Sequence, residues 1–381
     1  MKEMNNMAKK IIALYLPQYH EIPENNEWWG VGHTEWESCK KATPKFAGHY
    51  QPKVPLDNNY YDLSDQSAQV EQAALAKKYG VFGFCYYHYW FEGKLLLQLP
   101  AENMLKNPLI NIPFCFSWAN HSWVNKIDKN GKKELITQTY GKEDDWIKHF
   151  NYLLSFFTDD RYIKINNKPV FIIYDTYTIS CWESMRNIWI EMAKKAGFSG
   201  MYFVNTLKHE RDIELSNKYN FDAQFEYQPT FSVAKRNRID FTWYYYYKRV
   251  FMKDIIGKPS YYSYDKIWSR ALTLTPNNNI TTYLGAFVDW DITARWGDKG
   301  LAYKGATPLK FKKYLKQQIQ RSKTMVDSEF IFVTAWNEWS EGAYLEPDTK
   351  HEFSYLEAVQ EALQETEELD IDSSKKIKNL S

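Results

Sequence analysis

The stretch TAWNEWSEGAYLEPD holds three glutamates within nine residues, directly after the apolar run FIFVTAW. They are Glu338, Glu341 and Glu346, and two tryptophans stand beside them. A carboxylate next to the end of a buried strand is costly to keep unless it is solvated, paired or used in chemistry. A solvated loop would explain the cluster as well as a catalytic site would, so the rest of the chain has to decide.

Paired carboxylates in an aromatic-lined cleft are the groups that cleave glycosidic bonds. One carboxyl group, kept protonated by its surroundings, donates to the leaving oxygen, and the other acts as base or nucleophile. Glu338 and Glu341 can face one pocket if Glu338 ends a strand and Glu341 begins the following loop. The spacing alone does not decide this, because the pattern E-x-x-E is common.

Other chemical motifs in the sequence are less specific. The D-W-D at 289–291 has the form that holds a divalent ion against a sugar-nucleotide diphosphate in many glycosyltransferases, but the D-I-D at 370–372 matches equally well. GVGHT, from Gly30, lacks the third glycine and the strand-then-helix setting of a dinucleotide loop. The sequence contains no P-loop, H-E-x-x-H or G-x-S-x-G. We therefore expect no cofactor and no metal.

Composition narrows the class of partner. Aromatic residues make up 17% of the chain, with 15 Trp, 29 Tyr and 22 Phe. Rings with an apolar face and a polar tip suit partly wet surfaces such as a sugar-binding cleft, although protein interfaces and ordinary cores use them too. The 48 basic and 47 acidic residues leave a net charge of +1 and no basic block. We expect an oligosaccharide or polysaccharide partner and no nucleic acid; the oligomeric state is left open.

Cysteines and apolar runs bear on the compartment. The four cysteines are far apart and form no C-x-x-C pair, so neither a disulfide framework nor a zinc site is predicted. The first apolar run, IIALYL, ends at Pro17 and is too short for a signal-peptide core. No stretch approaches the ~20 apolar residues of a membrane span. These features predict a cytoplasmic protein.

Eight short apolar runs rich in β-branched and aromatic residues recur along the chain. They begin at Ile11, Val81, Pro113, Pro169, Met201, Ala223, Thr282 and Phe330. Helical patterns lie at 64–80, 144–157, 181–197, 307–323 and 354–365. Near-continuous apolar strands alternating with helices predict a (β/α)₈ barrel of the TIM type. A doubly wound open sheet is the alternative, but the Gly-rich first turn that it usually carries is missing.

Two predicted connections are long. One, at about 20–62, contains EWWGVGHTEW, and the other, at about 229–281, contains FTWYYYYKRV. In a barrel both emerge at the C-terminal face, where barrel active sites lie. No linker marks a second domain, so we predict one catalytic barrel over residues 1–365 and a charged, flexible tail over 366–381.

Polar and aromatic side chains stand at or near the end of every predicted strand. They are Tyr19 and His20; His88 and Trp90; Trp118, Asn120 and His121; Asp175; Asn205; Glu226 and Tyr227; Asp289 and Asp291; and Trp336, Asn337, Glu338 and Glu341. Each has an ordinary explanation by itself: His88 could be a satisfied buried histidine, and Asp175 could cap a helix. Because all eight strand ends carry such groups, we interpret them as one pocket.

The resulting prediction is a cleft across the barrel mouth. Glu338 and Glu341 are expected to face His88, Trp118, Asn120 and Glu226, with Asp175 and Tyr227 holding hydroxyls from the opposite side. The loop after the first strand forms one wall with Trp28 and Trp29. A hydrophobic lid is the alternative role for these two tryptophans.

The chain resembles the WbsX-like family of bacterial polysaccharide-biosynthesis proteins, which is itself similar to glycoside hydrolase family 99. The matching strings are YLPQYHEIPENNEWWGVGHTEW, FAGHYQPKVPLD, YGVFGFCYYHYWFEGK, PFCFSWANHSW, DDRYIKINNKPVFIIYD and TAWNEWSEGAYLEPD, which together run from about residue 11 to residue 357. Family 99 members are (β/α)₈ barrels, and characterised ones are retaining endo-α-mannosidases. WbsX-like proteins are often labelled glycosyltransferases because their genes accompany surface-polysaccharide assembly, as of lipopolysaccharide O-antigen.

Carried over onto NEWSEG, the resemblance implies roles for both carboxylates. Glu341 would be the general acid/base, and Glu338 the base that draws the proton from the sugar 2-hydroxyl, so that O2 attacks the anomeric carbon and an anhydro-sugar forms. Two positions depart from the pattern. Ser340 stands where family 99 hydrolases usually carry His, and His121 where WbsX-like chains commonly carry Glu; both bear on substrate identity.

The sequence thus predicts an enzyme that cleaves or transglycosylates α-linked, mannose-like bonds of a bacterial surface polysaccharide with retention. A sugar-nucleotide-dependent glycosyltransferase that uses Asp289 and Asp291 is the first alternative. A non-catalytic glycan-binding barrel is the second.

Overall fold

The computed structural model describes residues 8–125, 133–234, 247–277, 279–326 and 328–378. Its centre is a closed barrel of eight parallel strands. The strands are β1 (Lys10–Tyr15), β2 (Val81–Phe91), β4 (Phe114–Trp118), β8 (Lys168–Ile173), β9 (Tyr202–Leu207), β10 (Ala223–Glu226), β12 (Thr281–Phe287) and β14 (Phe330–Thr334). Since β1 pairs with both β14 and β2, the sheet has no open edge, and the predicted (β/α)₈ barrel is confirmed.

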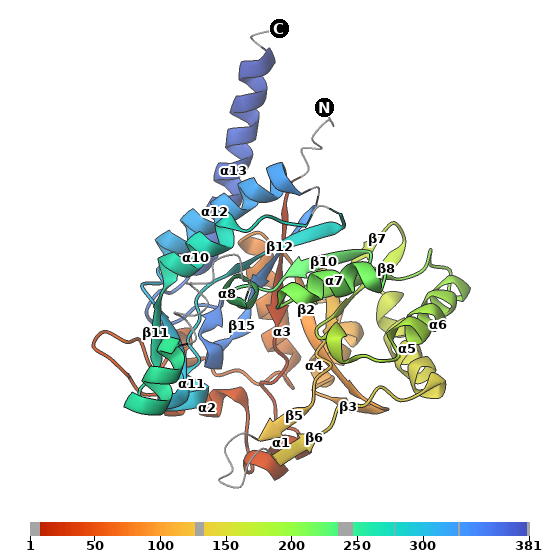
Figure 1. Cartoon of the computed structure of the whole chain (residues 1–381), viewed down its shortest axis with the longest axis horizontal. Helices are drawn as coiled ribbons and strands as arrows, with labels where there is room; N and C mark the ends of the chain where they lie inside the picture. Colours follow the sequence, from red (N-terminus) through yellow and green to blue (C-terminus); the bar gives the residue numbers. More distant parts are fainter. Residues whose placement is uncertain (1–7, 126–132, 235–246, 278, 327, 379–381) are drawn as a thin grey trace.

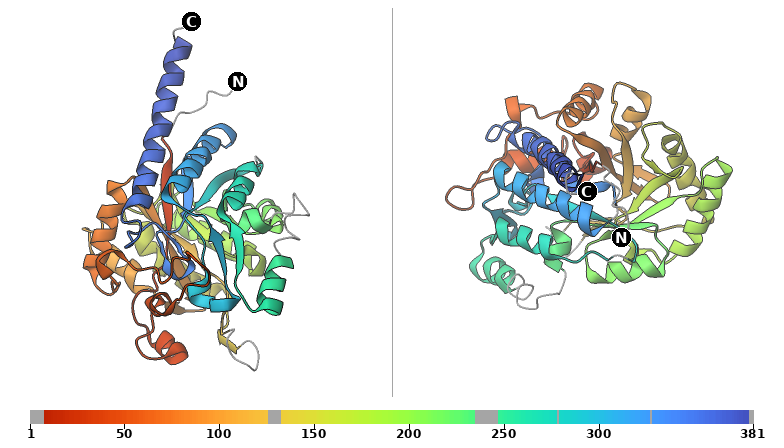
Figure 2. Two further views of the ribbon diagram at one scale, coloured as in Figure 1. Left: turned by 90° about the vertical axis from the view of Figure 1, so that its left-hand side faces the viewer. Right: turned by 90° about the horizontal axis from the view of Figure 1, so that it is seen from above.

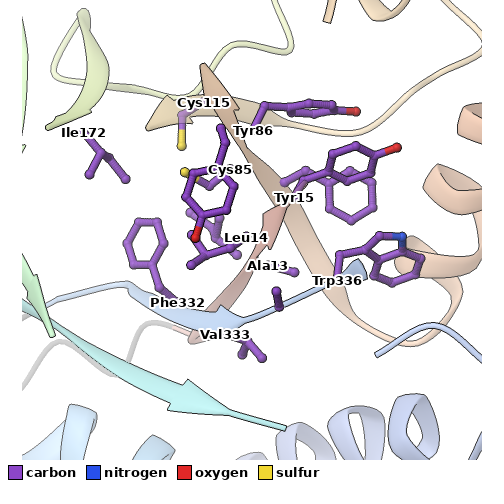
Figure 3. Close-up of a cluster of buried hydrophobic side chains, with 14 of the residues drawn as sticks. Ala13, Leu14, Tyr15, Cys85, Tyr86, Cys115, Ile172, Phe332, Val333 and Trp336 are labelled. Carbon is purple, nitrogen blue, oxygen red and sulfur yellow. The ribbon is translucent and has the colours of Figure 1, made fainter. Parts of the chain in front are cut away.

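Side chains of each barrel strand alternate between the barrel interior and the surrounding helices, as the period of two requires. Cys85 and Cys115 are register partners on β2 and β4, and both are buried free thiols, as predicted for small apolar side chains. In Figure 3 they lie on the same side of these strands, whereas Tyr86 projects from the other. This alternation determines which side chains at the strand ends reach the barrel mouth.

Helices surround the barrel on all sides (Figure 2, right). The longer ones are α3 (Gln66–Lys78), α4 (Leu99–Lys106), α5 (Glu143–Phe157), α6 (Trp182–Lys195), α7 (Glu210–Lys218), α10 (Tyr264–Thr273), α12 (Pro308–Met325) and α13 (Ser354–Lys378). The short helix α8 (Thr230–Ala234) follows β10. All five predicted helical patterns are present. Two of them begin with a side-chain cap: Asp65 accepts a hydrogen bond from the backbone N–H of Ser67 at the start of α3, and Thr307 accepts one from Lys310 at the start of α12.

Helix α13 extends well beyond the barrel at the end that also holds the N-terminus (Figures 1 and 2). Near the barrel it packs along α12, where Lys316 pairs with Glu365 at 2.6 Å. The tail predicted from residue 366 continues this helix as far as Lys378, and residues 379–381 lie outside the described part of the chain. The division of the chain at residue 365 stays a prediction.

The opposite end of the barrel carries the connections that follow the strands. They include α1 (Pro23–Trp29) and α2 (Glu35–Lys41) after β1, a hairpin of β5 (Trp123–Asn125) and β6 (Lys133–Ile136) after β4, and α11 (Thr293–Trp296) with β13 (Leu301–Lys304) after β12. After β14 come β15 (Asn337–Glu338), the 3₁₀ turn η5 (Trp339–Glu341) and β16 (Ala343–Tyr344). Of the predicted aromatic string FTWYYYYKRV, residues 241–246 lie outside the described residues.

Within the described ranges, we find no helix with the length and apolar character needed to cross a membrane.

Candidate active site

Glu338 and Glu341 lie on a tight hairpin at the end of the last barrel strand. β15 and β16 pair antiparallel around the turn η5, which Gly342 closes in the left-handed region at φ +67°. Asn337 fixes the hairpin to the chain after β1, because its side-chain oxygen accepts from the backbone N–H of Leu16 at 2.7 Å. The glutamates therefore stand on backbone that is tied to the barrel rather than on a free loop.

The two glutamates share one partly buried cation with a third glutamate. Arg295 of α11 donates to Glu341 at 2.5 Å and to Glu35 of α2 at 3.1 Å. The same guanidinium lies 3.9 Å from a carboxylate oxygen of Glu338. Ser340 completes the group: its hydroxyl accepts from Arg295 at 2.8 Å and donates to Glu35. Three carboxylates thus surround a single guanidinium.

This arrangement meets the distance condition for a glycosidic acid–base pair. Glu338 and Glu341 each approach a terminal nitrogen of the same planar guanidinium, at 3.9 and 2.5 Å. The facing oxygens of the two carboxylates therefore lie less than about 9 Å apart, below the ~9.5 Å upper limit for carboxylates that serve one anomeric centre.

One cation cannot neutralise three carboxylates, of which Glu338 and Glu35 are buried and Glu341 is partly buried, so the site favours a bound proton. Burial raises the pKa of Glu338 well above its usual range, the charge of Glu341 raises it further, and Arg295 opposes both only in part. Burial also raises the pKa of Glu341, but that carboxylate is in direct contact with the guanidinium. One oxygen of Glu338 is buried without a hydrogen-bond partner. Of the two carboxyl groups, Glu338 therefore holds a proton more readily than Glu341 does.

Four tyrosines surround the glutamates. The hydroxyls of Tyr87 and Tyr227 lie 3.4 Å apart, and the Tyr174 ring meets the Tyr227 ring edge-on at 5.6 Å between centroids. Burial raises the pKa of Tyr227, and the nearby Glu341 and Glu338 raise it further. The same holds for Tyr89, which is close to Glu338 and Glu35. Tyr227 was among the predicted site residues; the other three were not.

The predicted placement of His88, Trp90 and Trp118 beside the glutamates is wrong. His88 points away from the barrel interior and towards α5. Its ring nitrogen lies 2.8 Å from that of His149 on this helix. The ring of Trp90 stacks on His149 at 4.5 Å, and Trp118 meets the same ring edge-on. Burial lowers the pKa of His88 to about 3. This cluster, which we call the His88–His149 layer, fills the space between the barrel and α5.

The physical reason is the two-residue period of a strand. Because Cys85 faces the barrel interior, Tyr87 and Tyr89 do so as well, and the residues between them face the helices. The same period shows that the predicted position of Glu226 beside the glutamates is wrong. Since Tyr227 faces the barrel interior, the preceding residue Glu226 faces the helices. Glu226 is 1% exposed and acts electrostatically on Arg321 of α12, outside the barrel.

Asn120, His121 and Asp175 lie beyond the ends of β4 and β8. Asn120 joins the two strand ends, since its side chain exchanges two hydrogen bonds with the backbone of Asp175, both at 2.8 Å. Asp175 pairs with Lys208 at 3.1 Å. His121 is exposed beside the ring of Tyr174. Asn120 therefore supports the rim, and substrate contacts of the other two stay predictions.

Several predicted residues support the glutamate hairpin from below. The Tyr19 hydroxyl accepts from the backbone N–H of Trp339 and donates to the backbone oxygen of Asn337. His20 is buried behind it, and burial lowers its pKa. Trp336 is fully buried and packs on Phe84. Tyr19 therefore holds the hairpin backbone through two hydrogen bonds.

Glu346, the third glutamate of the segment, is held by neutral donors. Its oxygens accept from Trp336, Trp339, Tyr61 and Gln72 at 2.6–2.9 Å. Burial raises its pKa to about 7, although these four hydrogen bonds lower it. Every donor is supplied by the protein, so Glu346 is a structural residue.

The tryptophans of the first loop lie at the outer rim. Trp28 meets Trp123 of β5 edge-on at 5.8 Å, and Trp29 is 37% exposed. Figure 1 shows α1 beside the β5–β6 hairpin at the foot of the molecule. Their contact with a substrate stays a prediction.

Asp289 and Asp291 are engaged by the protein itself. Asp291 accepts from His49 and Gln51, each at 2.8 Å, and Asp289 pairs with Lys53 at 3.1 Å. Burial opposes ionisation of Asp291, but His49 and Lys53 lower its pKa to about 2. In the described part of the chain no group of His, Cys, Asp and Glu is arranged to hold a metal ion. With Lys53 against Asp289, this pair does not fit a divalent cation.

Arg295 is the site residue that sequence reasoning missed most clearly. It follows the D-W-D motif by four residues, in the string DITARWG. A cluster of buried acids needs a cation nearby. An arginine in the loop after the seventh strand could therefore have been predicted as the partner of the glutamates. Glu35 lies in the loop after the first strand, for which the sequence predicts a wall of the cleft built from Trp28 and Trp29.

Comparison with known proteins places this geometry in a family. A family model described as Glycosyltransferase WbsX matches residues 11–359. The chain belongs to this family. A relative named as uncharacterized protein WxcX, from Xanthomonas campestris pv. campestris (strain ATCC 33913), is 31% identical over 362 residues, and the WxcX of strain B100 is equally similar. The match covers 93% of this chain and 49% of each relative, so the chain spans about half the length of these curated relatives.

Solved structures share the fold of this WbsX family member. The GH99 endo-alpha-mannosidase from Bacteroides thetaiotaomicron gives a TM-score of 0.58 at 14% identity, over 94% of this chain and 97% of that one. A glycoside hydrolase-like protein gives 0.57 at 11% identity, over 94% of each chain. Likeness at this identity shows the (β/α)₈ fold alone.

Proposed function

We propose that this protein is a carbohydrate-active enzyme that cleaves α-linked, mannose-like bonds of a bacterial surface polysaccharide, or transfers the sugar to another acceptor, with retention. The observation that carries the proposal is the group of Glu338, Glu341 and Glu35 around one partly buried guanidinium at the barrel mouth. Such a group holds one carboxyl protonated and one ionised within reach of a single anomeric carbon, which is what acid–base cleavage of a glycoside requires.

The roles follow the family resemblance. Glu341 acts as general acid/base at the glycosidic oxygen. Glu338 takes the proton of the 2-hydroxyl, so that O2 attacks the anomeric carbon as the leaving group departs. Water, or an acceptor hydroxyl in a transfer reaction, then opens the anhydro-sugar with Glu341 as base.

The resting ion pair has to change for these roles. At rest Arg295 touches Glu341 and Glu338 is the group that holds a proton more readily, whereas the first step needs a protonated Glu341 and an ionised Glu338. We propose that the substrate moves the guanidinium from Glu341 towards Glu338, which is 3.9 Å away. One proton then passes from Glu338 to Glu341 with no change in total charge, because the carboxylate nearer the cation ionises more easily.

The test is turnover of a mixed panel of surface-polysaccharide oligosaccharides, read by mass spectrometry. Glu341→Gln and Glu338→Gln should each lower turnover by ~10²–10⁴-fold, the usual size of general acid–base catalysis. Glu352→Gln, a change of an exposed acid after the same strand, is the matched control. Full turnover in either catalytic variant would overturn the assignment.

A second candidate is favoured by the description of the matching family, which names a glycosyltransferase. That reaction would use a sugar nucleotide, but the metal-holding role predicted for Asp289 and Asp291 does not fit their pairing with Lys53, His49 and Gln51. Calorimetry with nucleotide diphosphates and manganese separates the two candidates: metal-dependent binding supports the transferase, and its absence with turnover of oligosaccharides supports the hydrolase-like enzyme. Tight oligosaccharide binding without turnover would instead indicate a glycan-binding barrel.

A further inference from the structure

A second cavity lies behind the glutamate hairpin. Its volume is about 190 Å³, and its walls come from the first loop, the segment after β12 and the segment after β16. At roughly 30 Å³ of liquid volume per water, it has room for about one sugar ring. It shares a wall with the candidate active site, because the backbone N–H of Asp291 donates to the Glu341 carbonyl at 2.7 Å and Lys53 donates to the Gly342 carbonyl at 3.2 Å.

The acidic side chains in this cavity already have donors. Asp291 accepts from His49 and Gln51, and Asp289 from Lys53. Asp348 accepts from the hydroxyl of Tyr344 and from two backbone N–H groups that follow it. A ligand would therefore find these carboxylates engaged.

The basic side chains at the cavity mouth have donors to spare. The Lys304 ammonium lies over the rings of Phe46 and Tyr261, at 3.8 and 4.2 Å. The Lys350 ammonium lies 4.8 Å from the ring of Tyr50. Among the described residues neither lysine forms an ion pair with a carboxylate. Aromatic faces hold an ammonium in place through the ring quadrupole, but they accept none of its hydrogen bonds in the way that an oxygen does.

We propose that this cavity binds an anionic sugar unit, whose carboxylate or phosphate contacts Lys304 and Lys350 while its ring rests against Tyr50. The unmatched donors select an acceptor-rich group, and the aromatic faces suit the apolar side of a sugar ring. This inference rests on the proposed function, since it makes the cavity a site for an acidic residue of the glycan on which Glu338 and Glu341 act.

The experiment is an NMR titration of the full chain with three probes, namely glucuronate, glucose 1-phosphate and glucose. The double variant Lys304→Gln/Lys350→Gln is compared with wild type and with Lys148→Gln/Lys313→Gln, which removes two lysines that lie outside the cavity lining. Thermal unfolding of each variant checks that it folds. Neither pair belongs to the glutamate hairpin.

We expect wild type and control to bind at least one anionic probe more than about 10-fold tighter than glucose, and the Lys304/Lys350 variant to lose about 10-fold or more of that affinity. Preference for glucuronate identifies a carboxylate, and preference for glucose 1-phosphate a phosphate; either supports the proposal. Equal binding of glucose, no binding of any probe, or unchanged binding in the double variant would overturn it. Because the titration needs no turnover, failure of the proposed catalytic function would leave its result intact.

Discussion

Glu338 and Glu346 are buried glutamates of the same short segment, yet they are held by different partners. Glu346 accepts four hydrogen bonds from neutral side chains, whereas Glu338 has an unpartnered oxygen and shares a cation with two other carboxylates. In the first arrangement protein donors occupy both oxygens of the Glu346 carboxylate, so no acceptor is left for a ligand. The second leaves charge and a proton to be resolved, which a reacting substrate can do. Burial of a carboxylate is therefore no mark of catalysis until its partners are counted.

Removing the shared cation should have the largest effect on this contrast. Arg295→Met takes away the charge that lowers the pKa of both Glu338 and Glu341, so both titrate at higher pH. At neutral pH too little ionised base remains, and we expect turnover to fall by ~10²-fold, the scale of losing one preorganised charge partner. The measurement is the pH dependence of kcat/KM, whose acidic limb should move to higher pH.

Arg211→Met is the control for this change, since Arg211 lies on α7 and contacts Tyr177. An Arg295→Met enzyme with an unmoved acidic limb would show that the guanidinium does not set the ionisation of the pair. The contrast between the two kinds of glutamate would then have to rest on burial alone.

Glu346 should affect stability instead of turnover chemistry. Its pKa is raised to about 7 in the folded state, above the value of an exposed glutamate, so the folded state binds the proton more tightly than the unfolded state does. The free energy of unfolding should therefore fall as pH rises from about 4.5 to 7, by on the order of 3 kcal/mol at most. Urea unfolding of wild type at several pH values measures this.

Glu346→Gln should flatten that pH dependence, because an amide does not titrate. It should also lower the free energy of unfolding by about 1–3 kcal/mol. The amide N–H₂ group would face N–H and O–H donors, to which the carboxylate oxygen accepted hydrogen bonds. An unchanged slope in this variant would assign the pH dependence to other groups. The Glu352→Gln protein, changed at an exposed position, provides the reference slope.

The smallest effect on activity is expected in the His88–His149 layer. His88→Leu removes a buried ring contact and leaves the His149 nitrogen without its partner, so stability should fall by about 1–3 kcal/mol. Turnover measured below the unfolding transition should stay within about 3-fold of wild type, because the side chain faces α5 and not the glutamates. A large change in KM would instead indicate that His88 contacts the substrate.

The strands and the barrel were predictable because their signal is local. A near-continuous apolar run such as PVFIIYD can be buried only as a covered strand, whatever its neighbours are. The side chain that each strand end presents to the mouth was less accessible to prediction. In YYHYW every residue is chemically plausible, and a shift of one residue exchanges Tyr87 and Tyr89 for His88 and Trp90.

The sequence by itself determined the eight strands, five of the helices and the position of Glu338 and Glu341 at the end of the last strand, since each depends on the periodicity of a short segment. Only the tertiary structure decided which faces turn inward and which cation the glutamates share. Arg295 lies 46 residues before Glu341 and 260 residues after Glu35, and the three meet because barrel closure brings the loops after the first, seventh and eighth strands to one point. Contacts of that range depend on how the sheet closes, which no local pattern records.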